Sequence, residues 1–217
     1  MGTYLEADSI LHSYGNRSIL TDVYLRCVPG DIIAIFGRNG AGKTTLFEIL
    51  TGIRKADRSF IRINDKIITK ATYKSGFITF LPQRSFLPKE LTVGRIIKLY
   101  DVNDSLFFND DIVFKTRNQK VRDLSGGEIR YLEVKLTLNI DAPFVILDEP
   151  FSGLSPVMVE HILDEIKGSA RIRGIILTDH KYKDVCKIAN RFMLLTDGYL
   201  KEINDANELI KSEYILS

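Results

Sequence analysis

A glycine-rich run near the start of the chain has the residue types and spacing that bind phosphate groups. Gly37-Arg38-Asn39-Gly40-Ala41-Gly42-Lys43-Thr44 fits the pattern G-x-x-x-x-G-K-[ST]. Glycines allow backbone N–H groups to curl around phosphate oxygens, Lys43 adds a positive charge, and the Thr44 hydroxyl can ligate Mg²⁺. A chance glycine turn is the alternative, but an apolar strand-like run precedes the loop and a helix-like segment follows it. The spacing therefore predicts a nucleotide site.

Two adjacent acids could complete the chemistry of such a site. Asp148 and Glu149 end the apolar run 144–147. A buried parallel strand delivers its carboxyl end to the ligand crevice, where Asp148 could bind Mg²⁺ and Glu149 could orient or deprotonate the attacking water. Many strands end in a polar turn, and that remains the alternative for this pair taken alone. Together with the glycine-rich run, the pair predicts the second half of a phosphate site.

A second glycine motif lies before that strand, at Leu124-Ser125-Gly126-Gly127-Glu128. A hydroxyl, two adjacent glycines and a following helix predict another anion-binding helix N-terminus. The simpler interpretation is that Ser125 caps the helix and the glycines form a loop.

The pattern of apolar residues predicts an α/β fold that positions these groups. Continuous apolar runs at 32–36, 144–147 and 174–177 predict buried parallel strands, and alternation at 4–11 and 23–28 predicts earlier strands. A hairpin is expected at 192–198, and helices are expected at 44–51, 157–167 and 184–189. Residues 84–122 differ in composition and predict a small helical insertion with a helix near 93–100.

The composition narrows the class of protein. The chain has 217 residues, a net charge of +2 and two cysteines, Cys27 and Cys186. We expect no nucleic-acid binding by bulk charge and no disulfide framework, which favours a reducing compartment. No apolar run approaches the roughly 20 residues of a membrane helix. If the protein acts at a membrane, a partner must hold it there.

The order of the motifs identifies a family resemblance. LSGGE, between GRNGAGKTT and FVILDEP, resembles the signature of the ABC ATPase family, and the resemblance covers nearly the whole chain. It implies a P-loop NTPase of the ABC ATPase type with an N-terminal antiparallel β subdomain. The single domain would span 1–217, with 1–83 and 123–217 forming a RecA-like core and about 84–122 forming the helical insertion.

The resemblance also assigns roles to residues. Glu149, His180 and Lys43 would be catalytic, and Thr44, Gln83 and Asp148 would bind Mg²⁺. Tyr14 would stack on adenine, although a strand tyrosine packing on its neighbours is the alternative. The residues that would bind ATP in the same chain are Tyr14, Gly37, Arg38, Asn39, Gly40, Ala41, Gly42, Lys43, Thr44, Thr45 and Gln83. The residues that would bind ATP from a second chain are Ser125, Gly126, Gly127 and Glu128.

The resemblance implies two partners. ATP would close a head-to-tail homodimer, and an integral membrane permease would hold the protein at the inner face of the cell membrane. Phe86, Leu87 and Pro88 either form the permease groove or cover the core of the insertion. A soluble ABC ATPase acting on ribosomes or DNA is the alternative, but such proteins usually carry two tandem domains or a long insertion. A non-hydrolysing binder is disfavoured because Glu149 is present.

The chain departs from the family at two places. Ser155 stands where the family usually has Asp, which puts the coupling between two ATP sites in doubt. The helix 129–138 lacks the usual run of small residues. Residues 178–181 and 188–198 are similar to the branch that includes branched-chain amino acid and lipopolysaccharide-export ATPases.

Overall fold

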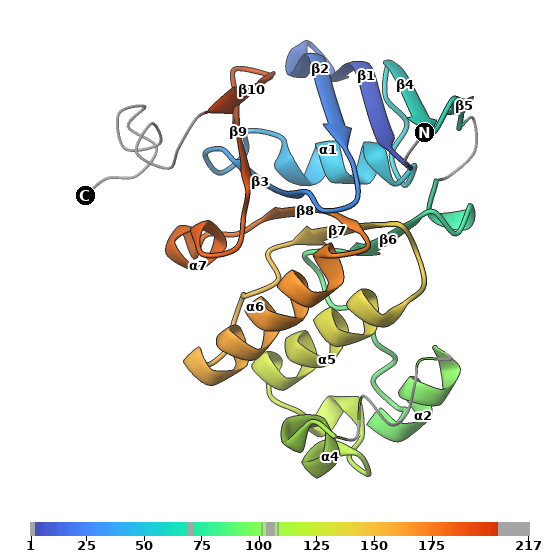
Figure 1. Cartoon of the computed structure of the whole chain (residues 1–217), viewed down its shortest axis with the longest axis vertical. Helices are drawn as coiled ribbons and strands as arrows, with labels where there is room; N and C mark the ends of the chain where they lie inside the picture. The colour runs from blue at the N-terminus through green and yellow to red at the C-terminus, as the bar shows by residue number, and fades with distance from the viewer. Residues whose placement is uncertain (1–2, 69–71, 101, 103–106, 108, 204–217) are drawn as a thin grey trace.

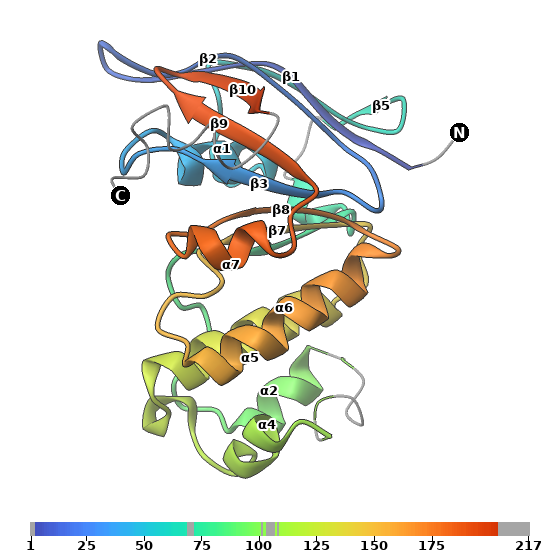
Figure 2. The same ribbon diagram turned by 60° about the vertical axis from the view of Figure 1, so that its left-hand side comes forward.

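The computed structural model describes residues 3–68, 72–100, 102, 107 and 109–203, and these form stacked layers (Figure 1). An antiparallel sheet lies at one end, followed by helix α1, a six-stranded sheet, a pair of long helices and a group of short helices (Figure 2). The two ends of the predicted domain, 1–2 and 204–217, lie outside the described residues.

The six-stranded sheet carries the residues predicted to do chemistry. Its strand order is β10-β9-β3-β8-β7-β6, and all neighbours are parallel except the β9–β10 hairpin. Every residue of β3, β7 and β8 is buried, because both faces of the sheet are covered. The strands are β3 (Ile32–Phe36), β6 (Ile78–Leu81), β7 (Phe144–Asp148), β8 (Gly174–Thr178), β9 (Arg191–Thr196) and β10 (Tyr199–Ile203).

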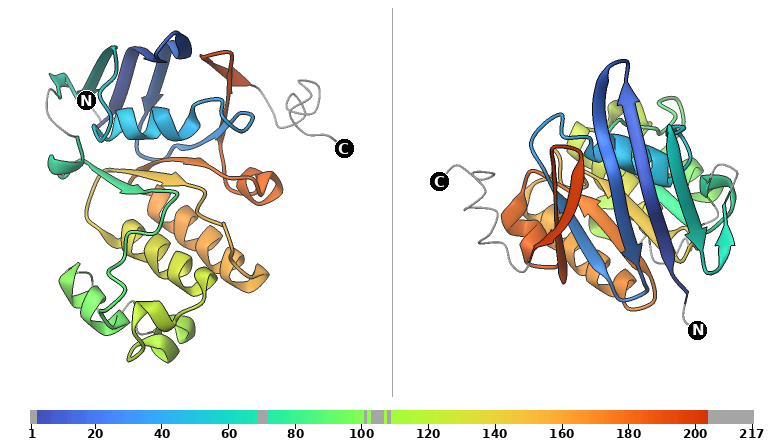
Figure 3. Two further views of the ribbon diagram at one scale, coloured as in Figure 1. Left: turned by 180° about the vertical axis from the view of Figure 1, so that it is seen from behind. Right: turned by 90° about the horizontal axis from the view of Figure 1, so that it is seen from above.

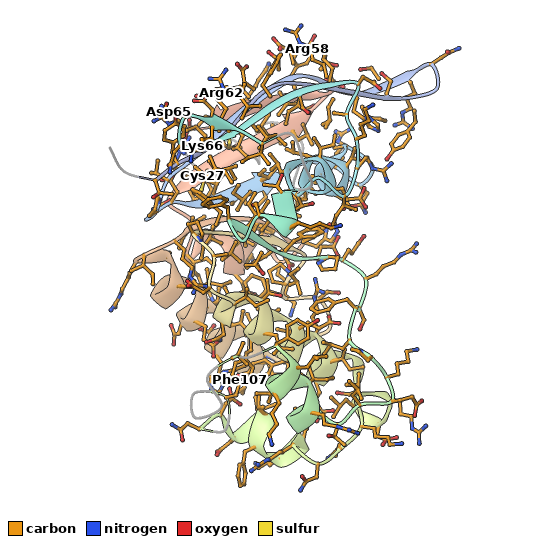
Figure 4. All side chains as sticks on the ribbon, turned by 90° about the vertical axis from the view of Figure 1, so that its right-hand side faces the viewer. Cys27, Arg58, Arg62, Asp65, Lys66 and Phe107 are labelled. Carbon is orange, nitrogen blue, oxygen red and sulfur yellow. The ribbon has the colours of Figure 1, made fainter. Side chains whose placement is uncertain are left out.

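The N-terminal sheet is antiparallel and has the order β2-β1-β4-β5. Its strands are β1 (Leu5–Tyr14), β2 (Arg17–Cys27), β4 (Arg58–Ile63) and β5 (Lys66–Ile67). Helix α1 (Lys43–Leu50) lies between the two sheets, and its apolar side packs into one shared core with both of them. The outer face of the antiparallel sheet is seen from above in Figure 3. Figure 4 shows Arg58 and Arg62 at the opposite end of the molecule from Phe107.

Helices cover the other face of the six-stranded sheet. The long helices α5 (Gly126–Asn139) and α6 (Pro156–Ala170) pack there, and α7 (Tyr182–Cys186) follows β8. Beyond α5 lie α2 (Val93–Leu99), α4 (Asp111–Thr116) and the 3₁₀ turn η2 (Val121–Asp123). Another 3₁₀ turn, η1 (Thr72–Lys74), precedes β6. The described side chains of both helical groups share one apolar core with the sheet.

The α/β architecture agrees with the sequence prediction, but some boundaries differ. β1 extends to Tyr14 and β2 begins at Arg17, not at residue 23, because Gly15 adopts φ +57° and closes a tight hairpin. Helix α7 spans Tyr182–Cys186, so the prediction of 184–189 began too late and ended too late.

Candidate nucleotide-binding site

The loop between β3 and α1, residues 37–42 (the glycine loop), needs glycine at defined places. Gly42 has φ +105°, and an added Cβ would lie 2.7 Å from Cγ2 of Ile19. At Gly37 an added Cβ would lie 2.7 Å from the carbonyl oxygen of Leu195. The positive φ requires glycine at Gly42, and close packing requires it at Gly37. The loop is therefore held tightly between strand β9 and the β1–β2 hairpin.

Lys43, the first residue of α1, folds its side chain back into this loop. Its Nζ donates to the carbonyl oxygens of Gly37 at 2.5 Å and Arg38 at 3.2 Å. Burial lowers the pKa of the ammonium group, and the charges of Asp148 and Glu149 act in the opposite direction. The first turn of α1 contains no acidic residue. The helix N-terminus and the ammonium group thus form a positive region suited to phosphate oxygens.

A hollow of about 510 Å³ opens above the glycine loop and α1, a size suited to a small-molecule ligand. Arg17 and Ile19 line it, although the sequence analysis did not single them out. A larger hollow of about 690 Å³ lies between the same loop and residues 194–198, but neither Lys43 nor Glu149 lines it. The residues that line the smaller hollow are Tyr14, Arg17, Ile19, Asn39, Gly40, Gly42, Lys43, Thr44, Thr45, Gln83, Glu149 and His180.

Tyr14 lines the hollow, and the residue as a whole is 46% exposed. The guanidinium of Arg54 lies over the ring at 5.2 Å, and His12 packs edge-on at 4.9 Å. The phenol oxygen lies 3.4 Å from the hydroxyl of Thr45. Tyr14 therefore packs on its neighbours while keeping exposed ring surface beside the glycine loop.

Asp148 ends β7 with a side chain that is buried but lacks a partner. The residue is 1% exposed, and neither carboxylate oxygen accepts a hydrogen bond from the described residues. Burial raises its pKa to about 6, with the charge of Glu149 adding to the effect, while Thr44, Arg130 and Lys43 oppose it. The Thr44 hydroxyl is close enough to lower this pKa but falls outside hydrogen-bond geometry. A bare buried carboxylate beside a hydroxyl fits a hard cation such as Mg²⁺.

Glu149 receives two side chains from the neighbouring strands. Its Oε1 accepts a hydrogen bond from Nε2 of Gln83 at 2.9 Å and lies 3.1 Å from Nε2 of His180. Its backbone has φ +55°, an uncommon conformation for a residue with a side chain, and its N–H donates to the carbonyl of Thr178 at 2.8 Å. Strained backbone of this kind is concentrated at functional sites. The parallel sheet thus brings together three predicted residues that lie far apart in sequence.

Buried charges around this turn were not singled out from the sequence. Asp179 is 6% exposed, and its carboxylate accepts hydrogen bonds from the N–H groups of Phe151 and Lys181, both at 2.8 Å. Burial raises its pKa, and these two hydrogen bonds lower it. Arg130 and Glu133 of α5 are also buried, at 6% and 1% exposed. The sequence offered one sign of these buried charges. Each is a charged residue close to a motif that is expected to pack against the sheet.

The second glycine motif, residues 124–128 (the signature), begins helix α5. The Ser125 hydroxyl accepts from the N–H of Glu128 at 3.2 Å, and the Glu128 carboxylate accepts from the Ser125 N–H at 2.8 Å, forming a capping box. A Cβ on Gly127 would lie 2.5 Å from the carbonyl oxygen of Gly153, whereas one on Gly126 would meet no described atom within 4 Å. None of these four residues lines the hollow described above.

Ser155 stands where the resembled family usually has Asp, and in the structure it caps the N-terminus of α6. Its hydroxyl accepts from the N–H of Met158 at 3.4 Å and caps α6, which has Pro156 in its first turn. Serine and aspartate are both favoured at this capping position. The substitution therefore preserves the start of α6 while removing a negative charge.

Comparisons with known proteins agree with this geometry. Residues 20–152 match the family model described as ABC transporter. The lipopolysaccharide export system ATP-binding protein LptB of Acidithiobacillus ferridurans is 30% identical over 225 residues, which cover 97% of this chain and 93% of that protein. LptB of Escherichia coli (strain K12) is 28% identical over 236 residues, covering 97% of this chain and 94% of that protein.

Two solved structures share the fold. The ATP binding subunit of an ABC transporter matches with a TM-score of 0.84 at 21% identity, covering 96% of this chain and 92% of that chain. A bacterial Atm1-family ABC exporter with ATP bound matches with a TM-score of 0.84 at 22% identity, covering 98% of this chain and 40% of that chain. In the part of the chain that the structure describes, no helix has the length and apolar character needed to span a membrane.

Proposed function

Because the chain belongs to the ABC transporter family, in which it is an ATP-binding subunit that powers transport through a membrane permease, we propose that its reaction is Mg²⁺-dependent hydrolysis of ATP to ADP and phosphate. The observation that carries this proposal is the meeting of Gln83, Glu149 and His180 at one carboxylate oxygen, on the wall of the hollow that the glycine loop borders. A site that only binds nucleotide has no need of a carboxylate held in this way.

In the proposed reaction, each residue acts on a defined part of the substrate. Lys43 and the N–H groups of the glycine loop bind the phosphates, and Tyr14 stacks on the base. Glu149 orients the attacking water and takes its proton, while Gln83 and His180 fix the direction of the carboxylate. Thr44, Gln83 and Asp148 would hold Mg²⁺, which when bound neutralises charge on the phosphate oxygens.

We further propose that the active form is a head-to-tail homodimer, in which the signature of one chain completes the site of the other. Two observations support this arrangement: the signature residues do not line the hollow of their own chain, and a side chain at Gly126 would meet no described atom within 4 Å. A glycine early in a helix costs stability, and no described atom packs where its side chain would lie, which is consistent with a ligand approaching from outside.

Mixing two defective variants tests both the reaction and the dimer. Lys43→Ala removes the phosphate charge, and Ser125→Arg blocks the signature. Each variant alone should be inactive in phosphate release. In a 1:1 mixture half of the dimers are mixed and each has one intact site, so we expect about a quarter of wild-type activity if the sites act independently. A mixture as inactive as either variant would contradict the head-to-tail arrangement, and an inactive wild type in complex with its permease would contradict hydrolysis.

The permease contact is proposed at the start of the insertion, with one correction. Leu87 is 5% exposed and belongs to the core, so it covers the insertion's interior and cannot line a groove. Phe86 is half-buried, with its ring 6.3 Å from that of Tyr100, and Pro88 is exposed. We propose that Phe86 and Pro88 contact the permease, which would hold the subunit at the inner face of the membrane.

Phe86→Asp tests this contact, with Phe114→Asp as the matched control because Phe114 of α4 is 58% exposed. We expect the first variant to lose co-purification with the permease and to keep ATP binding, and we expect the control to keep both. Equal co-purification of the two variants would contradict the contact. The alternative function, a soluble ABC ATPase acting on a macromolecular complex, is not favoured, since the relatives named above are transport subunits.

A further inference from the structure

Arg130 lies inside the protein, one turn after the signature begins helix α5. It is 6% exposed, and its guanidinium donates to three backbone carbonyls. Nη1 donates to Pro82 at 2.8 Å, Nη2 donates to Asp148, and Nε and Nη2 donate to Glu149 at 3.2 and 3.1 Å. A planar guanidinium can reach several acceptors at once, which an ammonium group cannot do in the same geometry. One side chain therefore ties β6 to the turn that follows β7.

Glu133, three residues further along α5, continues this arrangement. It is 1% exposed, and its Oε2 accepts from Nη1 of Arg130 at 3.3 Å. Its Oε1 accepts from the hydroxyl of Ser85 at 2.6 Å and from the N–H of Phe86 at 2.9 Å. The pair thus holds the chain on both sides of Gln83, by the carbonyl of Pro82 before it and by Ser85 and Phe86 after it.

We propose that Arg130 and Glu133 act as a positioning pair that fixes Gln83 and Glu149 relative to each other, so that the Glu149 carboxylate is aligned for the attacking water. This inference rests on the proposed function. Neither residue touches the nucleotide site itself. They act through the backbone of the residues that do, including the carbonyl of Glu149 next to its φ of +55°.

A contribution to folding stability does not by itself explain why Arg130 and Glu133 form a buried ion pair. Replacing a buried ion pair by apolar residues of similar size is often neutral or stabilising, because two charges no longer have to be desolvated. The pair instead satisfies carbonyls that belong to two separate loops. A displacement of about 1 Å at a reacting group can cost on the order of 100-fold in rate, so such alignment bears on catalysis.

The test compares a double variant with a control from the same helix. Arg130→Met/Glu133→Met removes both charges together and avoids leaving either one unpaired. We expect kcat for ATP hydrolysis to fall at least about tenfold while KM changes less than about threefold, the pattern of a lost transition-state alignment. Arg130→Lys should give an intermediate kcat, because the ion pair is kept and fewer carbonyls are reached. The control is Lys135→Met, which removes another buried cation of α5 that pairs with Asp110 and Glu165.

Hydrogen–deuterium exchange of the nucleotide-free chain gives a second readout that does not depend on hydrolysis. The double variant should exchange faster at 82–86 and 148–151, and Lys135→Met should lower the melting temperature without this local change. A folded double variant with wild-type kcat and wild-type exchange in both segments would overturn the positioning role. If the wild type binds ATP and does not hydrolyse it, the proposed function fails, and exchange in the two segments still decides the role of the pair.

Discussion

Nε2 of His180 lies 3.1 Å from Oε1 of Glu149, the same oxygen to which Gln83 donates at 2.9 Å. His180 follows β8 and Gln83 follows β6, the two strands that flank β7 in the sheet. For Nε2 to donate to the carboxylate, it must carry the ring proton. Glu149 is therefore held from both sides by the ends of neighbouring strands, and its direction is set by the register of the sheet.

Glu149→Gln should separate nucleotide binding from hydrolysis. The amide keeps the shape of the side chain but cannot accept a proton, so we expect phosphate release to fall roughly 100-fold or more. ATP affinity should remain within about threefold of wild type because Lys43 and the glycine loop are unchanged. Gel filtration with Mg²⁺-ATP should show more dimer, since the bound nucleotide persists. Glu160→Gln is the control, an exposed acid on α6 that pairs with Lys187; wild-type phosphate release by Glu149→Gln would refute the assigned role.

Tyr14→Ala and Tyr14→Phe should differ in their effect on ATP binding. Stacking of a base on an aromatic ring is worth about 1–3 kcal/mol, so the alanine variant should bind ATP roughly tenfold more weakly. The phenylalanine variant keeps the ring face and loses only the long contact to Thr45, so its Kd should stay within about twofold of wild type. Titration with a fluorescent ATP analogue measures both. If Tyr14→Ala lowers the melting temperature and leaves Kd unchanged, Tyr14 is only a packing residue of the strand.

Gly42→Ala should destabilise the nucleotide-free protein more than Gly40→Ala. Both glycines have positive φ, which costs a residue with a side chain about 1–2 kcal/mol. A Cβ at Gly40 would meet no atom of the described residues within 4 Å, whereas one at Gly42 would lie 2.7 Å from Ile19. We expect the second substitution to cost at least about 1 kcal/mol more, from overpacking against Ile19. Urea unfolding of both variants measures the difference, and equal midpoints would show that Ile19 moves aside without cost.

Asp148→Asn should stabilise the Mg²⁺-free, nucleotide-free protein at neutral pH. The pKa of Asp148 is raised from an ordinary 3.8 to about 6 by burial, so the folded chain holds this proton more tightly than the unfolded chain does. Its contribution to stability is complete below about pH 3.8 and is lost as the pH rises to about 6. The asparagine side chain does not ionise, so the variant loses no stability in this way. Its free energy of unfolding should exceed that of wild type by an amount that grows between about pH 3.8 and pH 6, to roughly 3 kcal/mol at most.

Unfolding in EDTA at pH 4, 5, 6 and 7.5 measures this difference between variant and wild type. Asp179 is present in both proteins, so its own titration cancels. A variant that is no more stable than wild type at pH 7.5 would mean that Asp148 has a stabilising partner in solution. The same variant should bind Mg²⁺-ATP more weakly, because a neutral amide replaces a charged oxygen ligand.

The buried parallel strands were the easiest elements to predict from the sequence. The run 32–36 coincides with β3, and the runs 144–147 and 174–177 fall one residue short of β7 and β8. Such strands are covered on both faces and so appear as continuous apolar runs. The family match confirms the fold class that these runs and the motifs predicted.

The β1–β2 hairpin was harder to predict because its strands are irregular. Ser9 has φ +52° and Asp22 has φ +57°, and the β1–β2 register shifts three times along the pair. Each irregularity interrupts the alternation of apolar and polar residues on which strand prediction depends. The sequence therefore predicts strands only at 4–11 and 23–28, and it does not predict the hairpin turn at Gly15.

Helix α5 explains why Arg130 and Glu133 were not predicted as part of the site. All nine residues from Arg130 to Leu138 are buried, so the helix has no exposed polar face in that stretch. Helices usually place charged residues outside, and this expectation fails here because the charges find partners in the interior.

Gly127 and Gly153 lie so close together that no side chain fits between them. Gly127 lies in the first turn of α5, the helix whose N-terminus would close over the partner's ATP in the proposed dimer, and Gly153 lies four residues after the chain's own Glu149. A displacement of either backbone would press on the other, because the contact leaves no free space between them. In the proposed dimer, each subunit would therefore have a direct backbone contact between the signature that reaches the partner's ATP and the loop that follows its own Glu149.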